Sequence, residues 1–355
     1  MLSIAQSIEL MGFVYTAQSL FIATGNFVKS IASVMLRAVG IITSATNSEC
    51  WLSSVNVDDW KRRLVMKHLS KRMPQNFNLF CFGDAHVGSV MFWEPGLDCL
   101  LNLVDSDYDG IPARNNFSLD HGDSIEAITI DDRKRFDLNT TKEFSLLKQV
   151  EFYVKKIKPL TAGRRLLAVL DGNHTRSQRT SGEWASEIAS RLNVPFGTWT
   201  VRFSYLNNKN RLMFKHFAGH GWNSINSKAK PRRRAVVNME IALRAALEHK
   251  AGDCMLMTMG HTHKLLIHDP EDYLFLHSVG GELKEGYTGL LSINQDADFI
   301  NPDFRWYGNT GCFRRTSVEG ITDYGEQAGF DPIQLGFLVA KVRDGKLVSV
   351  EKVRI

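Results

Sequence analysis

Residues 78–88 read NLFCFGDAHVG, an apolar run that ends in a glycine and is followed at once by an aspartate and a histidine. The apolar run is typical of a buried strand. A glycine turn at its end would point Asp84 and His86 into the crevice where open α/β sheets bind ligands. The segment therefore predicts an α/β enzyme whose polar groups gather at strand ends.

Four further segments repeat this arrangement in order along the chain. They read LDHGDSIEA, VLDGNHTR, FAGHGW and MGHTH, and each places Asp, Asn or His beside a glycine. A single Gly-Asp pair is usually only a turn, but independent turns give no reason for this succession. The candidate metal ligands of all five segments are Asp84, His86, Asp123, Asn173, His220, His261 and His263.

These ligand types indicate a particular chemistry. Carboxylate, imidazole and amide oxygen together suit Zn²⁺, Mn²⁺ or Fe, whereas an all-oxygen set would indicate Mg²⁺ or Ca²⁺. Two such ions roughly 3.5–4 Å apart can clamp a phosphoryl group and make hydroxide from bound water near neutral pH. The number of candidate ligands suffices for such a pair if one of them is shared. The sequence therefore predicts a two-metal hydrolytic centre.

The order D-x-H, GD, GNH, H, GHTH resembles the calcineurin-like metallophosphoesterases, and it spans the chain from Asp84 to His263. The resemblance implies two packed mixed β-sheets flanked by helices, a four-layer α/β/β/α sandwich. It also implies two divalent metal ions as cofactors. Mn²⁺ is the expected metal, and Zn²⁺, Fe or Ni²⁺ are the alternatives. One ion would be held by Asp84, His86, Asp123 and His263, and the other by Asp123, Asn173, His220 and His261, so that Asp123 bridges.

By the same resemblance, His174 protonates the leaving group, and the carboxylate of Glu126 orients it as a dyad. Arg176 and Arg179 follow the GNH segment and either bind a substrate phosphate bidentately or form ion pairs at the start of a helix. Protein Ser/Thr phosphatases of this superfamily have an arginine directly after the dyad acid. Ala127 stands there in this chain, which argues against a protein-phosphatase assignment.

The expected function is metal-dependent hydrolysis of phosphoesters, with a nucleic-acid phosphodiesterase or nuclease as the first reading. The basic run Lys228–Arg234 could contact a DNA or RNA backbone, or it could be a solvated loop. A phosphomonoesterase acting on small molecules or proteins is an alternative, and a non-catalytic binding protein on the same fold is a further one. The sequence leaves the oligomeric state open.

The C-terminal stretch GNTGCFRRTSVEGITDYGEQAGFDPIQLGF is similar to the tail of phosphoesterases encoded by bacteriophages and prophages. This resemblance suggests a phage-type member of the family. Within the stretch, Arg314 and Arg315 could either add to a rim for an anionic substrate or pair with Glu319 on the surface.

Composition fits a folded intracellular enzyme. Of the 355 residues, 44% are hydrophobic and 23% charged, as in ordinary globular chains. The five cysteines show no metal-binding spacing, which favours a reducing compartment, the cytoplasm, or the host cytoplasm if the chain is phage-encoded. The net charge of +5 favours anionic partners only weakly.

The domain boundaries are expected as follows. Residues 1–56 form an N-terminal extension, and residues 57–355 the catalytic domain, with a leading basic helix at 57–73 and a C-terminal sheet extension at 264–355. The stretch Leu10–Val28 is 19 residues long without a charge, but polar residues interrupt it. We expect it to be a soluble or surface-packed extension rather than a membrane span.

Alternation and spacing also predict the elements of the catalytic domain. Helices are expected at 95–105, 141–157, 181–192 and 235–249, and strands at 78–82, 116–119, 165–170, 198–205, 211–217 and 254–259. Residues 335–355 predict a terminal hairpin that turns at Asp344-Gly345, a strong local signal.

Overall fold

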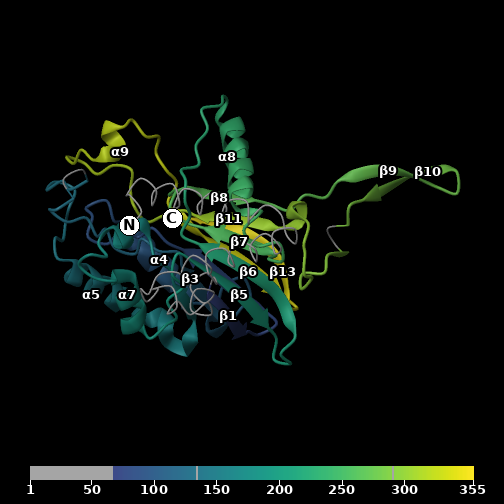
Figure 1. The fold of residues 1–355 in the computed structure, drawn as a ribbon, viewed down its shortest axis with the longest axis horizontal. Helices are drawn as coiled ribbons and strands as arrows, with labels where there is room; N and C mark the ends of the chain where they lie inside the picture. Colours follow the sequence, from purple (N-terminus) through teal and green to yellow (C-terminus); the bar gives the residue numbers. More distant parts are fainter. Residues whose placement is uncertain (1–66, 133–134, 290–291) are drawn as a thin grey trace, which may run out of the picture. The chain divides into compact units, whose positions relative to one another are not determined.

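Two mixed β-sheets organise the chain in the computed structural model, which describes residues 67–132, 135–289 and 292–355 (Figure 1). In order across the six-stranded sheet lie β1 (Lys67–Arg72), β5 (Thr200–Leu206), β6 (Leu212–Gly219), β7 (Leu256–Met259), β11 (Trp306–Thr310) and β8 (Leu265–His268). In order across the five-stranded sheet lie β13 (Lys346–Arg354), β12 (Gly336–Arg343), β2 (Phe77–Phe82), β3 (Asn116–Asp120) and β4 (Leu166–Val169).

Each sheet contains a block of parallel strands, and these blocks carry the polar loops. Strands β2, β3 and β4 run parallel in the five-stranded sheet, and β6, β7 and β11 run parallel in the other. Because parallel strands point the same way, the loops that follow them gather at one end of the sheet, beyond the carboxyl ends of the strands.

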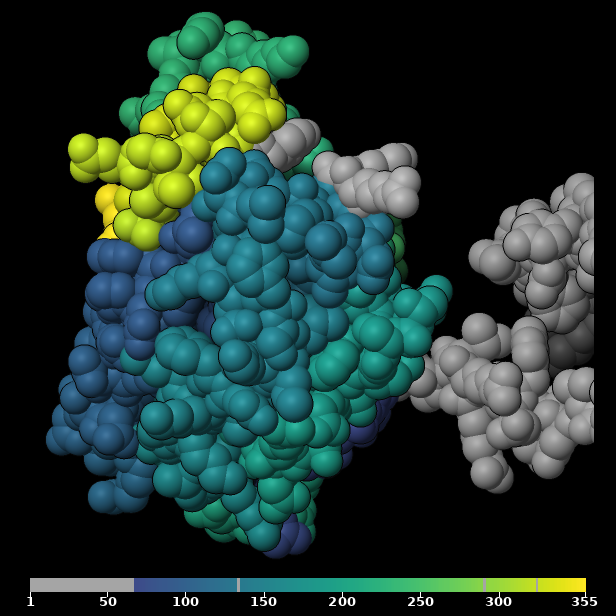
Figure 2. Space-filling model, turned by 90° about the vertical axis from the view of Figure 1, so that its left-hand side faces the viewer, coloured from purple at the N-terminus to yellow at the C-terminus, as the bar shows by residue number. Residues whose placement is uncertain are grey.

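The sheets pack face to face, and helices cover both outer faces. The core between the sheets is apolar and includes Phe77 and Leu79 of β2 with Val201 and Phe203 of β5. A second core joins the five-stranded sheet to α4 (Glu94–Val104), α5 (Leu146–Ile157) and α7 (Trp184–Leu192). A third core joins the six-stranded sheet to α8 (Arg232–Leu247). Figure 2 views the helical side of the five-stranded sheet, coloured blue to teal.

The remaining elements are short. They comprise α6 (Asn173–Ser177), α9 (Tyr324–Gln327), the hairpin of β9 (Leu274–Val279) and β10 (Glu282–Tyr287), and 3-10 turns at Ala113–Asn115, Lys158–Arg164 and Pro302–Phe304. Within the described ranges, no helix combines the length and the apolar composition that crossing a membrane requires.

The predicted α/β class with mixed sheets and flanking helices is confirmed, and most predicted elements lie within a few residues of their expected bounds. The terminal hairpin turns at Asp344 and Gly345, both at positive φ (50° and 75°), as its sequence predicted. The helix expected at 141–157 begins only at Leu146, because the side chain of Ser145 caps it by accepting from the Lys148 N–H.

The expected basic helix at 57–73 is wrong for the residues that the structure describes. Residues 67–72 form strand β1, which pairs in parallel with β5 at the edge of the six-stranded sheet. Leu69 packs on the core between the sheets, and Lys67 and Arg72 are exposed. Charged residues are a common feature of edge strands, and the pairing with β5 overrode the helical spacing. Residues 57–66, like the predicted extension at 1–56, lie outside the described part.

Candidate metal centre

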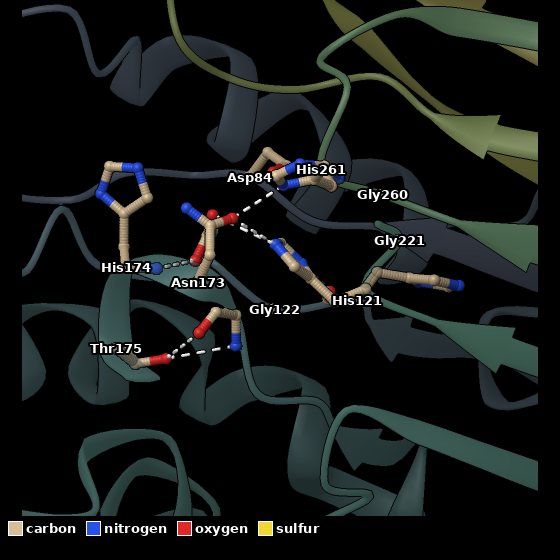
Figure 3. A network of polar contacts seen from close by, with 12 residues as sticks. Asp84, His121, Gly122, Asn173, His174, Thr175, Gly221, Gly260 and His261 are labelled. Carbon is tan, nitrogen blue, oxygen red and sulfur yellow. Dashed lines mark hydrogen bonds and ion pairs between the residues drawn. The ribbon is translucent and has the colours of Figure 1, made fainter. Parts of the chain in front are cut away.

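The seven candidate ligands all follow strands of the two parallel blocks. Asp84 and His86 follow β2, Asp123 follows β3, and Asn173 begins α6 after β4. In the other sheet, His220 follows β6, and the His261-His263 loop follows β7. The carboxyl ends of both blocks therefore bring these side chains together, and Figure 3 shows Asn173 reaching toward His261.

Asp84, His86 and His263 form one group. The Nε2 atoms of His86 and His263 lie 3.0 Å apart and face each other. Asp84 Oδ1 lies 3.5 Å from His263 Nε2 and 4.0 Å from His86 Nε2. This Oδ1 atom is buried and has no hydrogen-bond partner among the described residues. A buried carboxylate oxygen without a hydrogen-bond partner is costly, so this position favours a cation.

Asp123, Asn173, His220 and His261 form a second group. Asn173 Oδ1 lies 3.0 Å from His220 Nε2 and 2.7 Å from His261 Nδ1. Asp123 Oδ2 lies 3.2 Å from His220 Nε2. The ligand atoms of Asp123 lie within 4.8 Å of His86 as well as of His220 and His261. Asp123 therefore lies between the two groups, where a shared ligand would be.

The glycines of the motifs make room for these side chains. A Cβ atom at Gly172 would collide with the carboxylate and the backbone nitrogen of Asp123. The ligands themselves hold unusual backbone conformations: Asp84, His86, Asp123, His261 and His263 all have φ between 48° and 72°. Such strain clusters at functional sites, because only the surrounding structure can hold it.

Charges in the cluster are tightly coupled. Burial alone would raise the pKa of Asp123, but the imidazoles of His220 and His174 outweigh it and hold that pKa well below its ordinary value. Burial likewise disfavours protonated His220, yet the carboxylate of Asp123 raises the pKa of His220 to about 9. The buried carboxylates thus attract positive charge, which either a proton or a cation can supply.

The predicted His174–Glu126 dyad differs from the structure. His174 Nδ1 donates to the backbone carbonyl of Glu126 at 2.6 Å, not to its carboxylate. The Glu126 carboxylate instead accepts from Nδ1 of His86 at 2.8 Å. The longer side chain of glutamate reaches past His174 to this metal-ligand candidate. The two residues lie side by side as expected, but the predicted hydrogen bond between their side chains is not formed.

His174 itself lies beside the cluster (Figure 3). Its backbone N–H donates to Asp123 Oδ1 at 3.0 Å, and its ring packs edge-on against His86 with the centroids 4.5 Å apart. Because Nδ1 is held by the carbonyl, Nε2 is the nitrogen that can exchange a proton with a bound molecule.

Arg176 and Arg179 do not join the cluster. Arg176 Nη1 lies 3.3 Å from Asp171 Oδ2. Arg176 therefore forms an ion pair, which was one of its two predicted roles. Arg179 is exposed. In the C-terminal stretch, Arg314 pairs with Asp323 at 2.7 Å rather than with Glu319, whereas an Arg315 side-chain N–H donates to the Val90 carbonyl at 3.0 Å.

Sequence reasoning missed His121, which is fully buried next to the cluster. Its backbone carbonyl accepts from Nδ1 of His220 at 2.8 Å, which turns Nε2 of His220 toward Asp123. Its own Nε2 contacts Thr258 Oγ1 at 2.7 Å, and Thr258 Oγ1 also contacts His216 Nε2 at 2.7 Å. The only sequence signal was its place directly before Gly122-Asp123.

Comparison with protein-family models and with curated proteins gives no match. The function is therefore inferred from the geometry and the chemistry of the site alone.

Proposed function

We propose that this chain is a phosphoester hydrolase that uses two divalent metal ions. The observation that carries the proposal is the unpartnered Oδ1 atom of Asp84, buried between His86 and His263. A buried anion in this position calls for a cation. Its neighbours are imidazole nitrogens, which suit Mn²⁺, Zn²⁺ or Fe better than Mg²⁺ or Ca²⁺.

The residues present fit a pair of ions. Asp84, His86 and His263 would hold one, Asn173, His220 and His261 would hold the other, and Asp123 lies within reach of both sets. When bound, such ions polarise phosphoryl oxygens and lower the pKa of a bound water. Without any ion, these side chains would form a purely structural polar cluster, but that reading leaves Asp84 Oδ1 unsatisfied.

His174 would supply the proton for the leaving oxygen. Its two anchors, the carbonyl of Glu126 and the carboxylate of Asp123, fix both its ring and its backbone beside the candidate ligands. Such a held imidazole suits general acid catalysis, because its orientation is set before the substrate arrives.

A nucleic-acid backbone is the substrate class that the surface favours. Lys228, Lys230 and Arg232–Arg234 are all exposed, and they follow His220 by eight to fourteen residues. The last three open helix α8, whose N-terminal end also attracts anions. A diester backbone would engage this basic run, whereas a small phosphomonoester would not need it.

The test uses the full chain, stripped of metal and then loaded with Mn²⁺. We expect two ions per chain by mass spectrometry and turnover of bis-p-nitrophenyl phosphate. Asp123→Asn should lose the bound ions and the turnover. Asp296→Asn, a matched change at an exposed carboxylate, should keep both the ions and the turnover.

Other outcomes separate the alternatives. Faster turnover of p-nitrophenyl phosphate or of a phosphoserine peptide than of any diester would indicate a phosphomonoesterase. Two bound ions with no turnover of any phosphoester would indicate a binding protein on this fold. No bound ion and no turnover with Mn²⁺, Zn²⁺, Fe²⁺ or Ni²⁺ would overturn the proposal.

A further inference from the structure

The β9–β10 hairpin extends away from the two larger sheets as a separate two-stranded ribbon (Figure 1). Its strands pair antiparallel from Leu274↔Tyr287 to Val279↔Glu282. Gly280 and Gly281, with φ of 63° and 85°, form the tight turn between them. The turn and the pairing of the ribbon are therefore fixed by its own sequence. Neither strand pairs with another described strand.

Apolar side chains are exposed on this ribbon to an unusual degree. Leu276 is 61% exposed, Leu283 is 68% exposed and Tyr287 is 66% exposed, and Leu274, Phe275 and Val279 are exposed as well. An isolated two-stranded hairpin is at best marginally stable in water, and three or more strands with an apolar face are needed for stability. Contiguous exposed apolar surface of this kind marks an interaction site.

The hydrogen bonds at the base of the ribbon show which backbone groups face outward. Thr288 N donates to the Tyr273 carbonyl at 3.0 Å, and Val279 and Glu282 flank the two-residue turn. Backbone groups alternate along an antiparallel pair. Consequently Leu274, Leu276 and Ser278 direct their N–H and C=O groups outward from the free edge of β9.

The two outer edges differ in charge. β10 carries Glu282, Lys284 and Glu285, and such charges are how natural edge strands prevent pairing with other strands. β9, of sequence LFLHSV, carries no Asp, Glu, Lys, Arg or Pro. The edge of β9 is therefore the one that is open to another strand.

We propose that β9 pairs antiparallel with β9 of a second copy of this chain, around a two-fold axis at Leu276. Outward-facing residues can only oppose outward-facing residues. This register therefore places Leu276 opposite its own copy, Leu274 opposite Ser278, and Phe275 opposite His277. No like charges meet, and the two arms become one four-stranded sheet.

The symmetric partner follows from the sequence of the edge. An isologous contact requires that a segment match itself when reversed. β9 meets this condition because its central residue is apolar and its flanks are uncharged. The equivalent axis in β10, at its central outward-facing residue Glu285, would oppose two glutamates, and like charges directly opposite are destabilising.

Sedimentation and light scattering of the full chain test the proposal independently of any enzymatic activity. We expect a dimer whose dissociation constant rises about 10-fold or more in Leu276→Lys, because two lysines would then oppose each other. Leu283→Lys makes the same change in β10, on the face of the ribbon that also carries Leu276, and should leave the dimer intact. A monomeric wild-type chain, or equal weakening by both variants, would overturn the proposal.

Cysteine substitution tests the register itself. Paired residues of antiparallel strands lie within the distance that a disulfide spans. Leu276→Cys should therefore cross-link two chains under mild oxidation, whereas Ser278→Cys, which faces Leu274 of the other copy, should cross-link far less. A dimer in which neither variant cross-links would indicate another interface, including one made by residues 1–66, and would overturn the proposal.

Discussion

Glu126 Oε2 accepts a hydrogen bond from His86 Nδ1 at 2.8 Å, so this carboxylate orients a candidate metal ligand rather than the candidate proton donor. Both partners are buried. The bond leaves Nε2 of His86 free to face Asp84 and His263. A carboxylate behind a ligating imidazole fixes its tautomer and makes it a stronger ligand.

Replacing Glu126 should therefore weaken metal binding. Glu126→Ala is expected to raise the dissociation constant for Mn²⁺ by about 10–100-fold, because His86 loses the group that orients it. Glu126→Asp should behave similarly, since the shorter side chain cannot reach Nδ1. Calorimetric Mn²⁺ titration measures this, with Glu151→Gln on an exposed face as the control. Unchanged affinity with a selective loss on poor leaving groups would restore the predicted dyad.

His174→Ala tests the proton donor. Turnover of esters with poor leaving groups should fall by about 10²–10⁴, because the departing oxygen then lacks its acid. Esters of p-nitrophenol, which leave without protonation, should be affected much less. Metal content should stay at the wild-type value, since no ligand is removed. Equal losses on both kinds of ester would exclude the general-acid role.

The basic run of α8 should matter only for a long anionic substrate. Changing Arg232–Arg234 to alanine is expected to weaken DNA binding. It should also reduce the slope of log K against log[salt] by roughly 0.7–0.9 per lost phosphate contact. Turnover of bis-p-nitrophenyl phosphate should not change. The control removes three exposed basic residues elsewhere, Lys155, Lys158 and Arg164. If both triple variants bind DNA equally, the run is only a solvated helix start.

The sequence predicted which candidate ligands lie together better than it predicted the contacts that support them. The ligand loops follow apolar runs whose strand character is local, so their positions could be read directly. β1 could not, because Leu69 also fits a helical stripe, and only pairing with β5 decides between the two. The Glu126 carboxylate contacts His86 because the side chain of glutamate is one methylene longer than that of aspartate. The role of His121 rests on a backbone carbonyl, which no side-chain pattern reveals.

His121 should make the fold sensitive to acid. Burial lowers the pKa of His121 from an ordinary 6.5 to about 4, so the folded chain keeps this imidazole neutral. Between these two values only the unfolded chain binds the proton, and stability falls as the pH decreases. The loss attributable to His121 should be roughly 3 kcal/mol at pH 4 relative to pH 7. Burial lowers the pKa of His216 as well, which adds a loss in the same direction.

Urea unfolding at several pH values, with EDTA present so that metal release does not contribute, measures this loss. His220 acts in the opposite direction, because its raised pKa gives stability that is lost as the pH rises toward 9. The informative quantity is therefore the difference in pH slope between the wild type and His121→Gln. That slope should be shallower in the variant between pH 6.5 and pH 4, whereas His249→Gln, at an exposed position, should leave it unchanged. Identical slopes in all three proteins would show that His121 is protonated equally in the folded and unfolded chains.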